Sequence, residues 1–431
     1  IRLSGELDVA ALQVAVIDVI DRHESLRTVF PETGNGPVQV VLDAAQIVPD
    51  LTPVPVTEGN LIDHLVELAS MAFDVTGEVP LHARLFEVSE TEFVLGMVVH
   101  HISADGWSMG PLARDVMVAY AARTSWEQPA WAALPVQYAD YALWQREVLG
   151  SEDDAGSLIS GQIGYWVERL AGLPDELVLP WDRPRPPVAS YRGGTYPFVV
   201  SAEVQRRLVE LGRRQNASLF MVMHAALAVL LARLSGTGDI AVGTPVAGRG
   251  EAALDDLIGM FVNTLVLRVP VEPGAGFTEV LAGVRDADLH AFAHADVPFE
   301  RLVEVLNPSR SQARHPLFQV MLTFQNTRQA SLELPGLRVS PVEYDSRLAK
   351  FDVQLTLQEV VDRQGEVAGM SAEFSYARDL FDEATVAGFA ARLDRILAAV
   401  VADPEAPVGD IDVLSGAEHA RVLTQWNDTH H

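Results

Sequence analysis

Cysteine is missing from this chain of 431 residues. Its absence excludes disulfide bonds, thiolate nucleophiles and cysteine-ligated metals, and it suits a reducing cytoplasm, where we expect the protein to act. A membrane-spanning run is missing too, because the strongest apolar stretch, 219–234, is short and contains His224 and Arg233. No signal peptide precedes the first predicted helix. We therefore expect no membrane partner.

Excess positive charge is also lacking, since the formal net charge is −28. Nucleic acids and anionic membranes bind basic patches, so neither is expected as a partner. An apolar fraction of 48% with 21% charged residues is typical of a folded soluble protein. A chain of this length is too long for one ordinary hydrophobic core, which predicts two domains or lobes.

Hydrophobic periodicity predicts helices and strands that alternate in both halves of the chain. The predicted helices cover 8–28, 60–73, 107–123, 138–148, 202–215, 219–234, 277–293, 298–306 and 382–402. The predicted strands cover 93–101, 195–200, 239–243, 262–269, 317–325, 353–359 and 367–376. Strands interleaved with helices indicate lobes of the α/β or α+β class.

A proline-rich segment separates the two predicted lobes. Five prolines fall within 174–187, where neither a helix nor a central strand tolerates them. We therefore expect one lobe over 1–173, a second over 174–413, and a linker over 414–431. The terminal His430 and His431 are interpreted as the remnant of a purification tag and are not considered as site residues.

Two adjacent histidines close the apolar run 93–99 and precede a turn at Asp105 and Gly106, with a helix from Trp107 onward. Successive strand residues point to opposite faces, so His100 and His101 cannot share one target. One ring is expected in a cavity and the other in the structure. The same geometry argues against a metal site, and none is predicted.

Six elements in order resemble the signature motifs of the condensation domains of nonribosomal peptide synthetases. They lie at 22–30 (RHExLRTxF), 100–106 (HHxxxDG), 138–144 (YxDxAxW), 258–264 (IGxFVNT), 294–300 and 314–319. The family's earliest element, an SxAQxRLW-like helix, is not found, and we expect its place to precede residue 1. The linker 414–431 resembles the one that leads to an adenylation domain.

The resemblance implies an α/β (α+β) fold of two chloramphenicol-acetyltransferase-like lobes, arranged as a V-shaped pseudo-dimer with a tunnel between them. Upstream donor and downstream acceptor carrier domains would each present a phosphopantetheine arm at one mouth. The implied reaction joins a peptidyl or acyl thioester to the amine of an aminoacyl thioester. The domain itself is expected to bind no cofactor.

The resemblance also implies roles for the turn. His101 would be the catalytic residue, either accepting the aminium proton or orienting the neutral amine, and the sequence leaves both roles open. The N–H of Gly106 would donate to the developing oxyanion. His100 and Asp105 would hold the turn at the active site, with Arg22 or Arg27 as the partner of the carboxylate.

Four further residues are candidates for lining the tunnel or touching substrate, each with a plain packing alternative: Trp107, Ser108, Trp166 and Asn263. Asn263 would order a loop that floors the tunnel. Trp166 stands at helical spacing with other aromatic residues, a pattern more typical of a core. The stretches 314–321 and 349–352 resemble enzymes that take a D-configured donor.

Two other functions stay open. An epimerisation domain shares the fold and the signature, although Trp107 and Ser108 after the turn favour condensation. A non-catalytic condensation-like module that recruits tailoring enzymes is the second alternative, although such modules usually lose the second histidine, which this chain keeps as His101.

Overall fold

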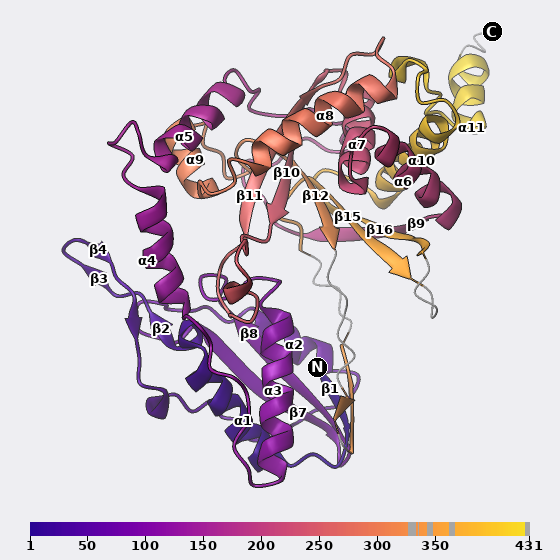
Figure 1. The fold of residues 1–431 in the computed structure, drawn as a ribbon. Helices are drawn as coiled ribbons and strands as arrows, with labels where there is room; N and C mark the ends of the chain where they lie inside the picture. The colour runs from indigo at the N-terminus through magenta and orange to yellow at the C-terminus, as the bar shows by residue number, and fades with distance from the viewer. Residues whose placement is uncertain (326–332, 335, 343–347, 362–366, 427–431) are drawn as a thin grey trace. The chain divides into compact units, whose positions relative to one another are not determined.

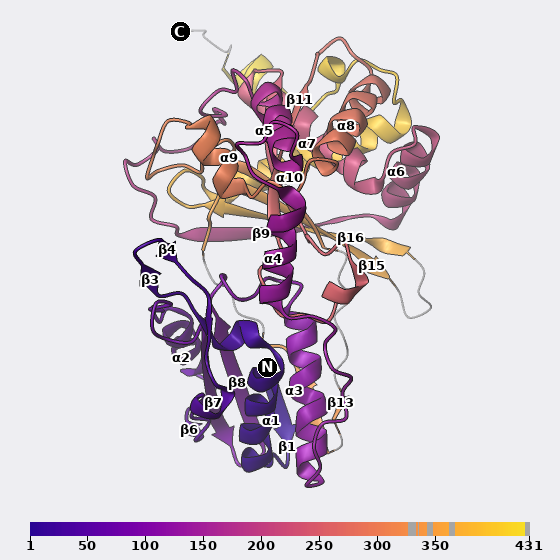
Figure 2. The same ribbon diagram turned by 60° about the vertical axis from the view of Figure 1, so that its left-hand side comes forward.

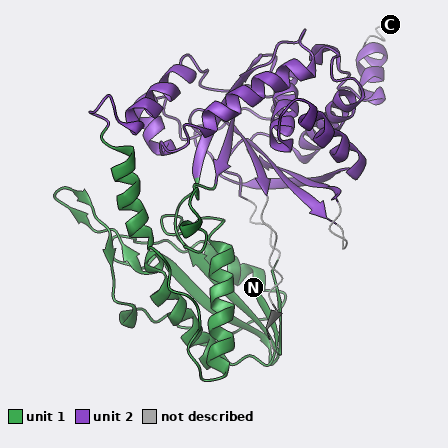
Figure 3. Ribbon diagram, in the orientation of Figure 1, with its two compact units in different colours: residues 1–151, 247–262, 327–346 green, residues 152–246, 263–326, 347–431 purple. Residues whose placement is uncertain are grey.

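The computed structural model describes residues 1–431 except 326–332, 335, 343–347, 362–366 and 427–431. The chain forms two compact units (Figure 3). Unit 1 comprises 1–151, 247–262 and 327–346; unit 2 comprises 152–246, 263–326 and 347–431. Each unit is built on a six-stranded mixed sheet with helices packed against it (Figure 1).

The sheet of unit 1 has the order β13-β14-β1-β8-β7-β6. Its strands are β1 (Arg2–Gly5), β6 (Val54–Pro55), β7 (Leu81–Ser89), β8 (Glu92–Val99), β13 (Glu333–Leu334) and β14 (Leu337–Ser340). Two small ribbons pair β2 (Thr28–Val29) with β5 (Val40–Val41) and β3 (Glu32–Thr33) with β4 (Gly36–Pro37). β7 and β8 form an antiparallel hairpin, and β1 joins β8 to β14.

Alternation along the central hairpin gives unit 1 an apolar layer on each face of its sheet. Leu85 and Leu95 belong to the larger cluster with helices α1 (Val9–Arg22) and α3 (Met109–Thr124). Phe86 and Val94 belong to a smaller cluster with α2 (Leu61–Ala69). Figures 1 and 2 both show α1 and α3 side by side along the sheet, and α4 (Tyr138–Leu149) follows α3.

The sheet of unit 2 has the order β11-β10-β12-β15-β16-β9. Its strands are β9 (Gly193–Val200), β10 (Asp239–Val246), β11 (Asn263–Pro270), β12 (Val320–Gln325), β15 (Val353–Val361) and β16 (Val367–Ala377). Its helices are α5 (Leu158–Arg169), α6 (Ala202–Arg214), α7 (Leu219–Ser235), α8 (Phe277–Phe292), α9 (Phe299–Leu306), α10 (Glu383–Ala402) and α11 (Gly416–Ala420). β10, β12 and β15 run parallel, and the other neighbours antiparallel.

Helix α7 is the centre of the unit 2 core. Ser218 caps its first turn by accepting from the Met221 N–H, and Gly236 ends it in the left-handed conformation, both as predicted. Its residues are apolar nearly all round because the sheet and neighbouring helices cover it on all sides. No single helix in the described part of the chain has the length and apolarity of a membrane span; only α6 and α7 taken together do, across a bend of 103°.

The predicted helices and strands listed above are found, with shifts at their ends, but the division of the chain differs from the predicted boundary after residue 173. Unit 2 already begins at residue 152, because α5 packs within it: the Trp166 indole donates to the carbonyl of His294 and the Gln162 amide to Asp296. Two later segments, 247–262 and 327–346, belong to unit 1. The boundary at 413/414 lies inside unit 2.

Candidate active site

The two histidines follow β8 directly. The His100 N–H donates to the Pro80 carbonyl over 2.9 Å, and its ring Nδ1 accepts from the Ile102 N–H over 3.0 Å. The ring of Phe73 meets His100 edge-on with centroids 5.6 Å apart, and stacks on His82 at 4.1 Å. These contacts hold the His100 ring in place as part of the turn.

The His101 side chain is exposed. Among the described residues, its ring has no recorded hydrogen-bond partner, so both nitrogens are available to a ligand. Gly106 is exposed as well, and its N–H has no recorded acceptor within the described chain. The turn therefore presents one imidazole and one backbone donor to solvent.

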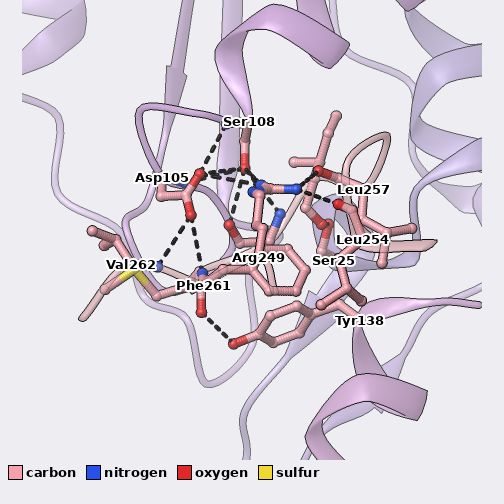
Figure 4. Close-up of polar contacts among 12 residues, drawn as sticks. Ser25, Asp105, Ser108, Tyr138, Arg249, Leu254, Leu257, Phe261 and Val262 are labelled. Atoms are coloured by element: carbon pink, nitrogen blue, oxygen red, sulfur yellow. Dashed lines mark hydrogen bonds and ion pairs between the residues drawn. The ribbon is translucent and has the colours of Figure 1, made fainter. Parts of the chain in front are cut away.

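Asp105 is the buried centre of the turn, with five donors around its carboxylate (Figure 4). Oδ1 accepts from the N–H of Ser108 over 2.8 Å, lies 2.8 Å from the Ser108 hydroxyl, and is 3.3 Å from the Arg249 guanidinium. Oδ2 accepts from the N–H groups of Phe261 and Val262 over 3.0 and 3.2 Å. A carboxylate with this many donors is held in one orientation.

Ser108 connects the turn to the segment 247–262. Its Oγ accepts from the Gly259 N–H over 3.1 Å and from Arg249 over 2.9 Å, and it also lies 2.9 Å from the Gly259 carbonyl. One hydroxyl proton serves either that carbonyl or Asp105. Ser108 is fully buried and engaged, so the expectation that it lines a tunnel is wrong for this side chain.

Further contacts hold the segment 247–262, some within it and some to other residues of unit 1. Arg249 donates to the carbonyls of Leu254 and Leu257, and its guanidinium lies 4.2 Å from the Phe261 ring centroid. The Ser25 hydroxyl donates to the Ile258 carbonyl over 2.7 Å, and the Tyr138 hydroxyl to Met260 over 2.8 Å. Burial raises the pKa of Tyr138 to about 12, which keeps this phenol protonated as a donor.

The arginine partner of Asp105 is Arg249, not Arg22 or Arg27 as predicted. Arg22 at the end of α1 donates to Asp115 of α3 over 2.9 Å and to the Ala132 carbonyl over 2.7 Å. Arg27 donates to the backbone carbonyls of Leu42 and Ile20. Both are used within the packing around α1 and cannot reach the turn as well.

His23 shares Asp115 with Arg22, its Nε2 lying 2.8 Å from the same carboxylate oxygen. Burial lowers the pKa of His23, although Asp115 acts in the opposite direction. The neutral ring then donates its Nε2 proton to Asp115. This buried group joins α1 to α3 and has no part in the turn.

Two candidate residues lie in unit 2. Asn263 donates its amide nitrogen to the carbonyls of Ala295 and Val297, each over 2.7 Å, and accepts from the Phe299 N–H over 3.0 Å. It therefore orders the loop that leads into α9, within the element predicted at 294–300. Trp166 is 1% exposed and belongs to the interior of unit 2, which corrects its candidacy as a tunnel residue. Trp107 is half-buried in unit 1.

No group of three or more histidine or carboxylate side chains suited to a metal ion occurs among the residues that the structure describes.

A sequence model of the family "Condensation domain" matches residues 1–423. The chain belongs to the condensation domain family. Its turn residues and the segment that holds them are therefore those of a condensation domain.

Curated relatives of this condensation domain are much longer proteins. It is 49% identical over 423 residues to a probable non-canonical nonribosomal peptide synthetase, CymA, of Salinispora arenicola, covering 98% of this chain and 5% of the relative. It is 47% identical over 426 residues to the dimodular nonribosomal peptide synthase of Bacillus subtilis, covering 99% of this chain and 18% of the relative. The chain thus spans less than a fifth of either relative.

Solved structures share the fold closely. The X-domain from teicoplanin biosynthesis has a TM-score of 0.89 and 38% identity, over 96% of this chain and 92% of that one. The same X-domain in complex with OxyB has a TM-score of 0.88 and 39% identity, over 96% and 90%.

Arg249 is the site residue of this condensation domain that lies outside the predicted set. It lies between two predicted elements, 239–243 and 258–264, and 144 residues from Asp105. No local pattern marks its pairing. The only available signal is the carboxylate itself, because a buried aspartate requires a cation or several donors somewhere in the fold.

Proposed function

We propose that this condensation domain forms an amide bond between a donor peptidyl or acyl thioester and the amine of an acceptor aminoacyl thioester. Both substrates would be carried on phosphopantetheine arms of carrier domains. The observation that carries the proposal is the exposed His101, whose ring has no hydrogen-bond partner in the described part of the chain. It lies on the same turn as the exposed Gly106, and Asp105 holds this turn. Family membership and the synthetase relatives support it.

The reaction is an aminolysis. The acceptor nitrogen attacks the donor carbonyl carbon, the C–N bond forms, the C–S bond breaks, and the nitrogen's extra proton passes to the leaving thiolate. A thioester is already activated, so aligning the two reactants supplies much of the rate. His101 would accept the proton or hold the amine by a hydrogen bond, since an imidazole ring can accept or donate a proton.

The buried network supports this chemistry through rigidity. A developing oxyanion is stabilised most by donors that are already in position, because no reorganisation is needed at the moment of reaction. Asp105 directly precedes Gly106 and accepts from the N–H of Ser108, two residues after Gly106. Its other oxygen accepts from the N–H groups of Phe261 and Val262. Asp105 and Arg249 are thus positioning residues.

The wider setting is part of the same proposal. We infer donor and acceptor carrier domains as partners, an adenylation domain beyond 414–431, a V-shaped arrangement with a tunnel to His101, no resident cofactor, and a cytoplasmic location. The length of the synthetase relatives supports a place in a larger assembly. The configuration of the donor is open.

The test compares the purified chain with His101→Ala, using carriers preloaded with defined donor and acceptor groups. Product on the acceptor carrier is quantified by mass spectrometry. His290→Ala is the matched control, since His290 is exposed on α8 in unit 2. The expected result is a loss of roughly 100-fold or more for His101→Ala with an unchanged melting curve, because a positioned acid–base group contributes about 100- to 10,000-fold. Near-normal product formation by His101→Ala would remove His101 from the mechanism.

Recruitment of another protein is the second candidate function. It is supported by the 38–39% identity to the X-domain and by the structure of that X-domain with OxyB. Size-exclusion chromatography with OxyB tests it: a stable complex together with no condensation product would favour recruitment. Epimerisation is tested separately, by chiral analysis of an aminoacyl carrier incubated without any acceptor.

A further inference from the structure

Unit 2 contains a cavity of about 670 Å³, and none of its wall residues belongs to the turn 100–106. Its walls come from 185–191, 311–316, 348–352 and 377–380. Two of these segments immediately precede β12 and β15. The chain passes from unit 2 into unit 1 after the opposite ends of β10 and β12, which run parallel to each other. The cavity is therefore at the other end of the unit 2 sheet from these crossings.

The cavity has the size of a small-molecule site, since such sites typically measure about 300–1,000 Å³. Most of its charged wall residues are already paired. Arg185 donates to Asp352, with one N–O distance of 2.8 Å, and to Glu176 over 2.8 Å. Asp379 accepts from the N–H and the hydroxyl of Ser190 over 2.8 and 2.7 Å.

Lys350 is the exception. It is exposed, it lines the cavity, and its ammonium has no recorded partner among the residues that the structure describes. It is also the only lysine in the chain, whose other side-chain cations are arginines and histidines. An ammonium offers three donors and one charge to an incoming anion.

Beside Lys350 the wall is apolar and aromatic. Tyr191 and Leu348 are 54% and 63% exposed, and Phe351 is half-buried. The Ala349 N–H donates to the Tyr191 carbonyl over 2.9 Å, which holds these side chains on adjacent segments. Tyr191 keeps a left-handed backbone with φ of 56°, a costly conformation for a large aromatic residue. Large exposed side chains around one free cation are typical of a ligand site.

We propose that this cavity binds an amphipathic monocarboxylate. Its apolar part would pack against Tyr191, Leu348 and Phe351, and its carboxylate would accept from Lys350. Among the described wall residues one cation has no partner, which matches a ligand with a single negative charge. The carboxylates of Asp352 and Asp379 in the same wall disfavour a dianion such as a phosphate monoester.

The single lysine supplies the assay. Apart from the amino terminus, an acetylating N-hydroxysuccinimide ester reacts with one amine in the whole chain, that of Lys350. Peptide mass spectrometry follows the rate at which Lys350 is acetylated. Sodium decanoate is the probe, with decanol and decyl phosphate as comparisons. We expect decanoate to slow acetylation of Lys350 in a saturable way, decanol to have no such effect, and decyl phosphate to bind more weakly than decanoate.

Two variants distinguish the effect of the Lys350 ammonium from the effect of the net charge of the chain. Lys350→Gln should bind decanoate roughly tenfold more weakly in calorimetry, the loss of one charge-assisted hydrogen bond. Arg206→Gln on exposed α6 makes the same change in net charge and should bind decanoate like the parent chain. Tyr191→Asn keeps a residue that tolerates the left-handed backbone and should also weaken decanoate binding.

Three results would each overturn the proposal. They are equal decanoate binding by Lys350→Gln and the parent chain, acetylation of Lys350 that decanoate does not slow, and tighter binding of decyl phosphate than of decanoate. None of these readouts measures amide formation. The proposed condensation activity therefore stands or falls separately.

Discussion

Asp105 and Arg249 form an ion pair of 3.3 Å between residues 144 positions apart, with side chains 0% and 6% exposed. The pair joins the turn after β8 to the segment 247–262, which leaves the sheet of unit 2 at the end of β10. The turn of the candidate site in one unit is thus held by residues that lie in the sequence between two strands of the other unit's sheet.

Replacing Arg249 should destabilise unit 1 severely. Arg249→Met keeps an apolar stem but leaves Asp105 without its cation, and breaking a buried pair from one side costs about 3 to 5 kcal/mol. Urea unfolding monitored by circular dichroism measures the change. Arg206→Met on exposed α6 is the control and should shift the midpoint little.

The double variant Asp105→Asn with Arg249→Met extends that experiment. Because the uncompensated charge is removed, the double variant should be less destabilised than the sum of the two single variants. Additive losses would show that the two side chains do not interact.

Gly259 should not accept a side chain. An added Cβ would lie 2.3 Å from Cδ2 of Tyr138 and 2.7 Å from Cε2 of Phe261. Gly259→Ala must push both rings and is expected to cost about 1 to 3 kcal/mol, as overpacking commonly does. Gly250→Ala in the same segment meets nothing within 4 Å and is the matched control. Thermal unfolding of the two variants tests this prediction. Equal melting temperatures for Gly259→Ala and Gly250→Ala would contradict the packing argument.

Local periodicity predicts most elements of this fold because each helix or strand shows its buried face in nearby residues. Helix α7 is a clear case, with apolar residues between a serine cap and a glycine cap. Strand β7 lies outside the predicted strands, since His82 and Arg84 interrupt its apolar pattern. β14 is equally hidden, because its partner β1 lies more than three hundred residues earlier in the sequence.

The candidate site divides in the same way. That Asp105 holds the turn through an arginine follows from the resemblance, and the kind of partner is right. The identity of the arginine is wrong, because Arg22 is satisfied by Asp115 and Arg249 is brought in by long-range packing. Ser108 and Trp166 were candidates for lining the tunnel, but both side chains are buried. The spacing of residues in a motif does not indicate which of them are buried.

Asn263 should be irreplaceable even by its closest analogue. Asn263→Asp keeps the acceptor for Phe299 but loses both donations, and it places a carboxylate against the carbonyls of Ala295 and Val297. We expect a loss of about 1 kcal/mol in the free energy of unfolding, because these half-buried polar groups lose their hydrogen bonds. Asn216→Asp, at an exposed position with φ of 52° after α6, is the control. Equal stability of the two variants would refute this reading of the loop.

His315 should make the stability of unit 2 depend on pH. Its ring packs among Phe299, Phe318 and Phe351 and its Nδ1–H donates to the Pro316 carbonyl over 2.9 Å. Burial lowers the pKa of His315 below its ordinary value of 6.5, although its backbone contacts act in the opposite direction. The unfolded chain therefore takes up this proton first as the pH falls through 6.5.

It follows that the contribution of His315 to stability is fully present above pH 6.5 and is lost as the pH falls below that value, at up to about 1.4 kcal/mol per pH unit for one proton. His315→Asn removes this titration and keeps a donor near Pro316. Urea unfolding at pH 7.5, 6.5 and 5.5 should give a shallower loss of stability for the variant than for the parent. Parallel pH curves would mean that the ring is protonated as readily in the folded protein as in the unfolded chain, contrary to the effect of its aromatic surroundings.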